Sequence, residues 1–227
     1  MSQSKFTTIG RKVLMALSGF FLMFFLLQHL TINMLSVISP EAFNDVSYFM
    51  GNNPVIQFVM QPILIFAVIF HFIMGMYLEY QNNKARSIKY AYNKPGENSN
   101  WMSRNMIYSG IAVLAFLGVH FYDFWIPEIT EKFIENSFSS DPQNGKDFHH
   151  HIVEKFQDTT RVILYVIAFL ALALHLLHGF QSSFQSVGFN NNKYTPTIKK
   201  LGNIFAIAVP ALFAFVAIYH FLNPLHH

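Results

Sequence analysis

Imidazole side chains recur inside long apolar stretches of this 227-residue chain, where ionisable groups are normally rare. Six of the eleven histidines lie in such stretches: His29, His71, His120, His175, His178 and His220. An ionisable side chain at membrane depth is costly and marks a functional site. Neutral imidazole is a common axial ligand of haem iron, and two facing helices that each present one at the same depth can hold a haem between them. The histidines therefore indicate a membrane haem protein.

The stretches that carry these histidines are long enough to cross a bilayer. Charged residues make up 12% of the chain and hydrophobic residues 52%, whereas a soluble domain carries about 25% charged residues. Five apolar segments each approach the ~20 residues that span a ~30 Å hydrocarbon core: Val13–Ile38, Val55–Tyr80, Met106–Ile126, Val162–Gln185 and Ile204–Leu222. We therefore predict an all-α bundle of five transmembrane helices that forms one membrane-spanning domain over residues 1–227.

The chain has no cysteine, which excludes disulfides, Cys-ligated iron–sulfur clusters and covalent haem attachment through C-x-x-C-H. Any haem is thus held non-covalently by axial ligands. Nothing in the sequence predicts a nucleic-acid partner.

Basic residues predict the orientation of the bundle. Eleven of the fifteen fall before the first segment or in the second and fourth connections: Lys5, Arg11, Lys12, Lys84, Arg86, Lys89, Lys94, Arg104, Lys193, Lys199 and Lys200. The positive-inside rule then places the N-terminus in the cytoplasm and the C-terminus outside. We expect a multi-pass protein of the bacterial cytoplasmic membrane.

Chain direction predicts how the histidines pair. His29 lies 17 residues after Lys12 and His120 lies 16 after Arg104, so both reach roughly 25 Å from the cytoplasmic side at ~1.5 Å per residue. His71 lies 13 residues before Lys84, and His175 lies 13 before Gly188, roughly 20 Å from that side. This predicts an outer pair, His29 with His120, and an inner pair, His71 with His175, for two haems.

Other histidines leave alternatives open. His178 lies three residues after His175 on nearly the same helix face, so spacing alone does not say which of them binds iron. We interpret His220 as a hydrogen-bonding residue near the outer interface. His149, His150 and His151 stand in a polar stretch and are interpreted as solvated.

Four stretches of the chain carry a family resemblance. They read IGRKVLMALSGFFLMFFLLQHL, FAVIFHFIMGMYLEY, GIAVLAFLGVHFYDF and LALHLLHGFQSSFQSVG. Together they resemble the five-helix, dihaem cytochrome b subunit of succinate dehydrogenase and fumarate reductase. The resemblance implies that His29, His71, His120 and one histidine of the fourth helix are iron ligands. The family's glycines four and thirteen residues beyond that ligand match Gly179 and Gly188 when it is His175, and the resemblance therefore favours His175.

The resemblance also implies a function and partners. It implies a membrane anchor with two haems b that reduces a quinone, expected to be menaquinone, and does no chemistry on succinate itself. Its implied partners on the cytoplasmic side are a flavoprotein with covalently bound FAD and an iron–sulfur subunit. Ala173 and the stretch Tyr48-Phe49-Met50 stand where some fumarate-reducing members have acidic residues, which favours succinate oxidation over fumarate reduction.

Two other functions remain possible from the residues. The chain could be the haem b subunit of another quinone-linked complex, such as a hydrogenase or formate dehydrogenase. It could also be a haem-free transporter whose histidines relay protons, although we expect the apolar segments to lack the intramembrane carboxylates that such relays use.

Overall fold

The structure is a computed structural model that describes residues 8–85, 106–134, 147–189 and 191–225, and all its regular elements are helical. Five of its helical stretches are long and apolar enough to cross a membrane: Ile9–Ile38, Ile56–Lys84, Met106–Phe133, Thr159–Ser186 and Thr195–Leu222. This confirms the predicted all-α, five-span bundle and a multi-pass membrane protein. Which end of the bundle faces the cytoplasm stays a prediction.

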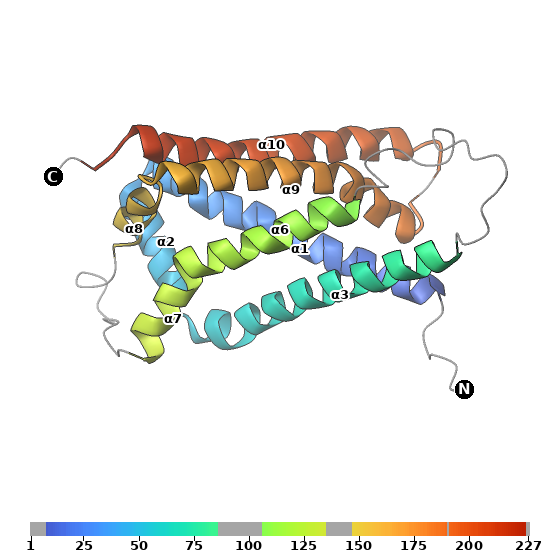
Figure 1. The fold of residues 1–227 in the computed structure, drawn as a ribbon, viewed down its shortest axis with the longest axis horizontal. Helices are drawn as coiled ribbons and strands as arrows, with labels where there is room; N and C mark the ends of the chain where they lie inside the picture. Colours follow the sequence, from blue (N-terminus) through green and yellow to red (C-terminus); the bar gives the residue numbers. More distant parts are fainter. Residues whose placement is uncertain (1–7, 86–105, 135–146, 190, 226–227) are drawn as a thin grey trace.

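The spans are longer than the apolar segments alone suggested. The first is α1 (Thr8–Ile38), the second is η1 (Ile56–Met60) with α3 (Gln61–Ala85), and the third is α6 (Met106–His120), η2 (Phe121–Trp125) and α7 (Ile126–Phe133). The last two are α9 (Thr159–Ser186) and α10 (Thr195–Leu222). In Figure 1 they run roughly along one axis, with α10 and α9 on one side of the bundle and α3 on the other.

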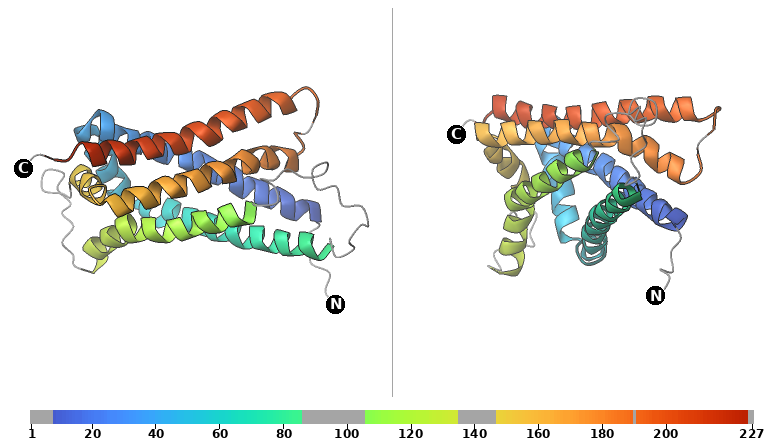
Figure 2. Two further views of the ribbon diagram at one scale, coloured as in Figure 1. Left: turned by 45° about the horizontal axis from the view of Figure 1, so that its top comes forward. Right: turned by 45° about the vertical axis from the view of Figure 1, so that its right-hand side comes forward.

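Helix α9 lies at the centre of the packing. It contacts α10 most extensively and also contacts α6 and α1, whereas α3 packs mainly on α1. The views in Figure 2 agree with this arrangement. The histidine-bearing faces of α1, α3, α6 and α9 are thereby turned towards one another.

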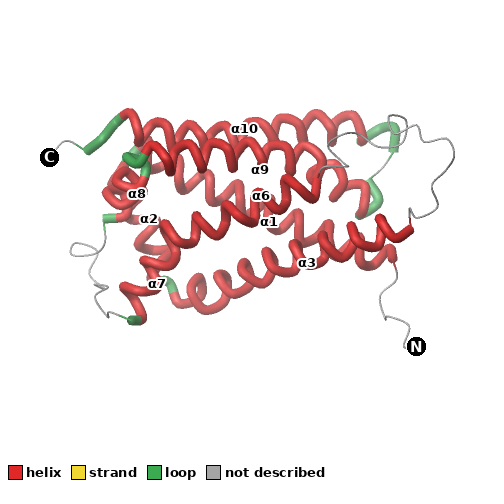
Figure 3. The backbone as a smooth tube through the Cα atoms, in the orientation of Figure 1, coloured by secondary structure: helices red, strands yellow, loops and turns green. Residues whose placement is uncertain are grey.

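Two short helices cover one end of the bundle. They are α2 (Pro40–Asn52) and α8 (Phe148–Lys155), and the sequence analysis predicted neither. Each begins at a side-chain cap, because Ser39 accepts a hydrogen bond from the Ala42 amide and Asp147 accepts one from the His150 amide. Figure 3 shows both at the end of the bundle where α10 finishes.

The buried apolar core gathers at this covered end. It contains Phe43 of α2, Val153 of α8, Tyr165 and Phe169 of α9, and Phe213 of α10. Elsewhere large apolar side chains remain exposed, such as Phe24 at 71% and Phe66 at 68%. Such an apolar outer surface is what a bilayer solvates in place of water.

Two π-helical turns interrupt the spans, and each lies next to a proline. Pro62 follows η1 and Pro127 follows η2. Proline has no N–H, so Pro127 leaves the carbonyl of Asp123, four residues earlier, without its helical donor. The imidazole Nε2 of His151 lies 3.1 Å from that carbonyl oxygen instead. Turns of this type are frequent at functional sites, and η2 starts directly after His120.

Candidate functional site

The inner histidine pair joins α3 to α9. The ring centroids of His71 and His175 lie 6.3 Å apart with an interplanar angle of 68°. A metal–imidazole bond is about 2.0–2.1 Å long, so the rings of two ligands on opposite sides of one iron should have centroids about 6 Å apart. The spacing of this pair fits an iron between two axial ligands.

A serine lies next to the Nδ1 atom of each inner histidine. The Ser18 hydroxyl oxygen of α1 is 2.9 Å from His71 Nδ1, and the Ser109 hydroxyl oxygen of α6 is 3.4 Å from His175 Nδ1. Each serine donates its own proton to a backbone carbonyl three residues earlier, that of Met15 or of Met106. A hydroxyl has one proton to donate, so towards the histidine each oxygen acts as an acceptor.

This arrangement sets the tautomer of the inner histidines. If the serine accepts, Nδ1 carries the imidazole proton and the lone pair stands on Nε2. Histidines that bind metals are commonly oriented in this way by a hydrogen bond from the other ring nitrogen. The inner pair therefore presents two Nε2 lone pairs suited to iron.

A glycine follows each of these serines and lets the helices approach closely. A Cβ atom on Gly19 would lie 3.0 Å from the Ser183 hydroxyl oxygen and 3.7 Å from His71 Cε1. On Gly110 it would lie 3.5 Å from His175 Cε1. A side chain at Gly19 would thus crowd the Ser183 hydroxyl of α9, and its Cβ atom would lie in van der Waals contact with the His71 ring.

The outer pair joins α1 to the end of α6. The rings of His29 and His120 have centroids 5.7 Å apart and are nearly perpendicular, at 85°. His120 Nδ1 is buried without a hydrogen-bond partner, and His29 Nε2 lies 3.4 Å from the Asn33 amide nitrogen. The centroid spacing again suits two axial ligands, but within the described part of the chain no serine contact with either ring is found.

The two pairs lie at clearly different depths. Ser18, which marks the inner pair on α1, precedes His29 by 11 residues, and Ser109 precedes His120 by 11 residues on α6. At ~1.5 Å per residue each helix separates the sites by roughly 16 Å. Both helices carry the same pattern, Ser-Gly followed by nine residues and a histidine. This repeated pattern is a sequence signal that the analysis of the histidines missed.

The remaining histidines lie apart from both pairs. His178 is half-buried one turn beyond His175, and among the described residues its ring makes no stacking contact with His71. His220 is 1% exposed, and its Nε2 lies 2.8 Å from the Ser36 hydroxyl oxygen. The interpretation of His149 and His151 as solvated is wrong, because both are half-buried. His149 Nε2 lies 3.1 Å from the Ser36 carbonyl oxygen, and its ring packs on His220.

A buried carboxylate next to the outer pair also escaped the sequence analysis. Asp123 of η2 is 1% exposed, and its Oδ2 accepts a hydrogen bond of 3.0 Å from the Tyr165 hydroxyl. The Arg161 guanidinium lies 3.4 Å from Oδ1, within ion-pair distance although it forms no hydrogen bond there. The expectation that the apolar segments lack carboxylates is therefore wrong at this position.

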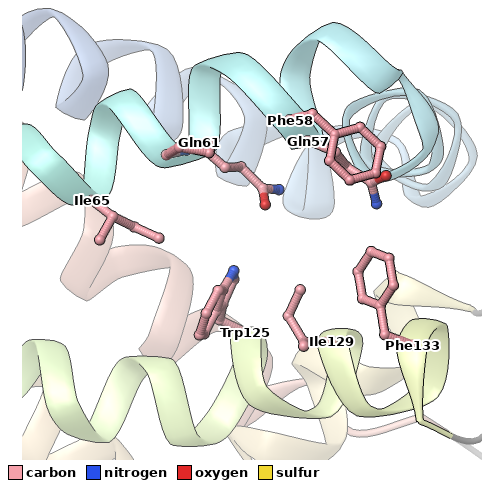
Figure 4. Close-up of a pocket in the computed structure, with 8 residues that line it drawn as sticks. Gln57, Phe58, Gln61, Ile65, Trp125, Ile129 and Phe133 are labelled. Carbon is pink, nitrogen blue, oxygen red and sulfur yellow. The ribbon is translucent and has the colours of Figure 1, made fainter.

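A shallow cavity of about 160 Å³ opens between the second and third spans, beyond the outer pair along the third. Its lining is mostly apolar and comes from η1, α3, η2 and α7: Gln57, Phe58, Gln61, Pro62, Ile65, Trp125, Ile129 and Phe133. In Figure 4 the Gln61 amide and the Trp125 indole nitrogen both point into the space between the helices. The site thus combines a flat apolar wall with a few hydrogen-bond donors.

Among the described residues, no group of three or more His, Cys, Asp or Glu side chains could hold a bare metal ion. A haem needs no such group, because the porphyrin supplies four ligands and the protein supplies the axial ones. Paired histidines on facing transmembrane helices define the class of protein as a candidate membrane cytochrome.

Comparison with known proteins gives a more particular resemblance. Residues 7–81 match the model of a family described as "Succinate dehydrogenase/Fumarate reductase transmembrane subunit". The succinate dehydrogenase cytochrome b558 subunit of Bacillus subtilis (strain 168) is 29% identical over 100 residues, which cover 44% of this chain and 46% of that relative. The chain thus spans about half the length of the curated relative it matches. No solved structure matches it significantly.

Both comparisons confirm the resemblance predicted from the sequence. This chain is a multi-pass membrane protein similar to the membrane cytochrome subunits of succinate dehydrogenase and fumarate reductase. The family match includes His29 and His71, one histidine of each pair.

Proposed function

We propose that this chain is the dihaem cytochrome b anchor of a succinate:quinone oxidoreductase. The observation that carries the proposal is the pair of histidine sites, one above the other, with centroid spacings of 6.3 and 5.7 Å. His71 and His175 would hold the inner haem, and His29 and His120 the outer one. When bound, haem supplies one-electron transfer.

The chain's own residues contribute binding and orientation. Ser18 and Ser109 accept from Nδ1–H of the inner histidines, which leaves the Nε2 lone pairs available to iron. Gly19 and Gly110 keep the helices close beside those rings. The chain does no chemistry on succinate, which would be oxidised on a soluble flavoprotein subunit.

We place the partners at the basic end of the bundle. Lys12, Lys84, Lys193, Lys199 and Lys200 are exposed where α1 begins, α3 ends and α10 begins. These three helix ends lie at one end of the bundle in Figure 1. Lys5, Arg86, Lys89, Lys94 and Arg104 lie outside the described residues. An iron–sulfur subunit docked at this end would deliver electrons to the inner haem first.

The cavity lined by Gln61 and Trp125 is our candidate for the quinone headgroup. A quinone is a flat apolar ring with two carbonyl acceptors, which suits an apolar wall with amide and indole donors. The cavity lies on the side of the outer pair, so the electron path would run from the inner haem to the outer haem and then to the quinone. Menaquinone is the expected quinone, and succinate oxidation is the expected direction.

Another quinone-linked complex is the alternative function. A hydrogenase or formate dehydrogenase would also use a haem b subunit, whereas the similarity to a succinate dehydrogenase subunit favours the present proposal. A pyridine haemochrome assay on the purified full chain should give two non-covalent haems b per chain. Absence of haem would refute the proposal, and haem without a co-purifying flavoprotein would favour the alternative.

A further inference from the structure

A buried carboxylate, that of Asp123, lies near the outer pair. The described contacts of the inner pair include no carboxylate. Asp123, three residues after His120, is a carboxylate with 1% exposure inside a membrane span. Its two oxygens face Tyr165 and Arg161 of α9, and its backbone oxygen faces His151 of α8. A buried charge is costly unless it is paired and hydrogen-bonded, so this arrangement holds a negative charge at a defined place.

Tyr165 connects this charge to the outer pair. Its ring is 3% exposed and packs against the His120 ring with centroids 6.3 Å apart, while its hydroxyl binds Asp123. Phe124 also packs on both His120 and Tyr165. The carboxylate is therefore separated from the His120 ring by one tyrosine side chain.

The two charged side chains of the ion pair differ in their solvent exposure. The Asp123 side chain is 1% exposed and the Arg161 side chain is 28% exposed. Water screens the guanidinium more strongly than the carboxylate. The net field at His120 therefore has the sign of the carboxylate, in spite of the nearby cation.

The inner pair has a different environment. The described hydrogen-bond partners of His71 and His175 are neutral: the hydroxyls of Ser18 and Ser109, and the Met106 backbone for His175. A fixed negative charge favours the ferric over the ferrous state of a nearby iron, because the ferric state carries one more positive charge. The two sites are thus not electrostatically equivalent.

We propose that Asp123 is a positioning residue that lowers the midpoint potential of the outer haem. Arg161 and Tyr165 hold its carboxylate in place. The inference rests on the proposed dihaem function. It adds a residue that sets the midpoint potential of one of the two haems. With this charge in place, the outer haem would be harder to reduce than it would be without it.

The test is a redox titration of membranes that contain the full chain, followed by absorbance of each haem. The outer haem is identified as the one that His120→Ala removes. Asp123→Asn should raise the midpoint potential of the outer haem and leave the inner one unchanged, and Asp123→Glu should restore the original value. The double variant Asp123→Asn/Arg161→Gln removes both charges of the ion pair, and it should also raise the outer potential, because the net field at His120 has the sign of the carboxylate.

Several outcomes would overturn the inference. One is an outer potential that stays unchanged in Asp123→Asn with both haems bound, and another is an equal shift of both haems. If Asp123→Asn does not retain the outer haem, the double variant Asp123→Asn/Arg161→Gln decides, and an unchanged or lowered outer potential in it contradicts the inference. Loss of the outer haem in both variants would mean that the ion pair holds the site together and does not tune it. Absence of haem in the unmodified chain would instead refute the proposed function itself.

Discussion

The Ser18 hydroxyl oxygen lies 2.9 Å from Nδ1 of His71 and donates its own proton to the Met15 carbonyl. The contact therefore fixes both the orientation of the ring and the position of its proton. The same geometry recurs at Ser109 and His175 on the facing helices, although the distance there is longer, at 3.4 Å.

Ser18→Ala should weaken the inner haem site and leave the outer one intact. Loss of a hydrogen-bond partner to a ligating histidine typically costs about 10–100-fold in metal affinity. Haem titration of the purified chain, followed by the spectrum of each haem, measures the effect. Ser36→Ala is the matched control, because Ser36 contacts His220 and neither pair. An inner haem bound as tightly as in the unmodified chain would contradict the role of Ser18.

His175→Ala should remove the inner haem, whereas His178→Ala should leave two haems per chain. The reason is that the ring facing His71 at 6.3 Å is that of His175. The haemochrome assay on both variants decides between them. The reverse result would assign the iron to His178.

His29→Ala and His120→Ala should each remove the same haem, because the two rings face one site. Difference spectra of the two variants should show the same missing absorption band. Two different missing bands would mean that these histidines belong to separate haems.

Gln61→Leu should slow quinone reduction without changing haem content. It removes one neutral hydrogen-bond donor from the cavity, worth about 0.5–1.5 kcal/mol, or about 2- to 10-fold in KM for the quinone. The measurement is the rate of quinone reduction by the intact complex over a range of quinone concentrations. Gln185→Leu, an exposed position near the end of α9, serves as the control. Equal effects of the two substitutions on KM would contradict the assignment of this cavity as the quinone site.

Acid should loosen the covered end of the bundle through Asp147. Burial raises the pKa of this carboxyl, but hydrogen bonds from the His150 amide and the Asn44 side chain outweigh it and leave the pKa below its usual value. A lowered pKa in the folded state means a stabilisation that is fully present above the unfolded value, near 4, and is lost as pH falls through the folded value.

Thermal unfolding of the detergent-solubilised chain between about pH 6 and pH 3 tests this behaviour. Asp147→Asn keeps a good helix cap without the charge, so it should reduce the loss of stability on acidification. If the unmodified chain and Asp147→Asn lose stability equally on acidification, Asp147 is not the cause of that loss.

Much of the architecture follows from the sequence because hydropathy and chain direction are properties of each segment by itself. A span of about 20 apolar residues needs a bilayer whatever its neighbours are. The rise per residue then sets the depth of each histidine, as for His29 and His120. The five spans were predicted correctly on that basis.

Side-chain partners could not be predicted, because they depend on how each helix is rotated and on what packs beside it. Asp123 and Tyr165 are 42 residues apart in the chain, and their hydrogen bond exists because α9 packs along the third span. His149 was predicted to be solvated from its polar neighbours, yet α8 folds back on α1 and α10 and half-buries it.

The sequence by itself determined that this protein crosses a membrane five times with histidines at two depths, because length, polarity and rise are local. Only the tertiary structure decided that serines lie beside Nδ1 of His71 and His175, and that a buried carboxylate lies near His120. Those relationships join residues on different helices, and packing between helices sets them.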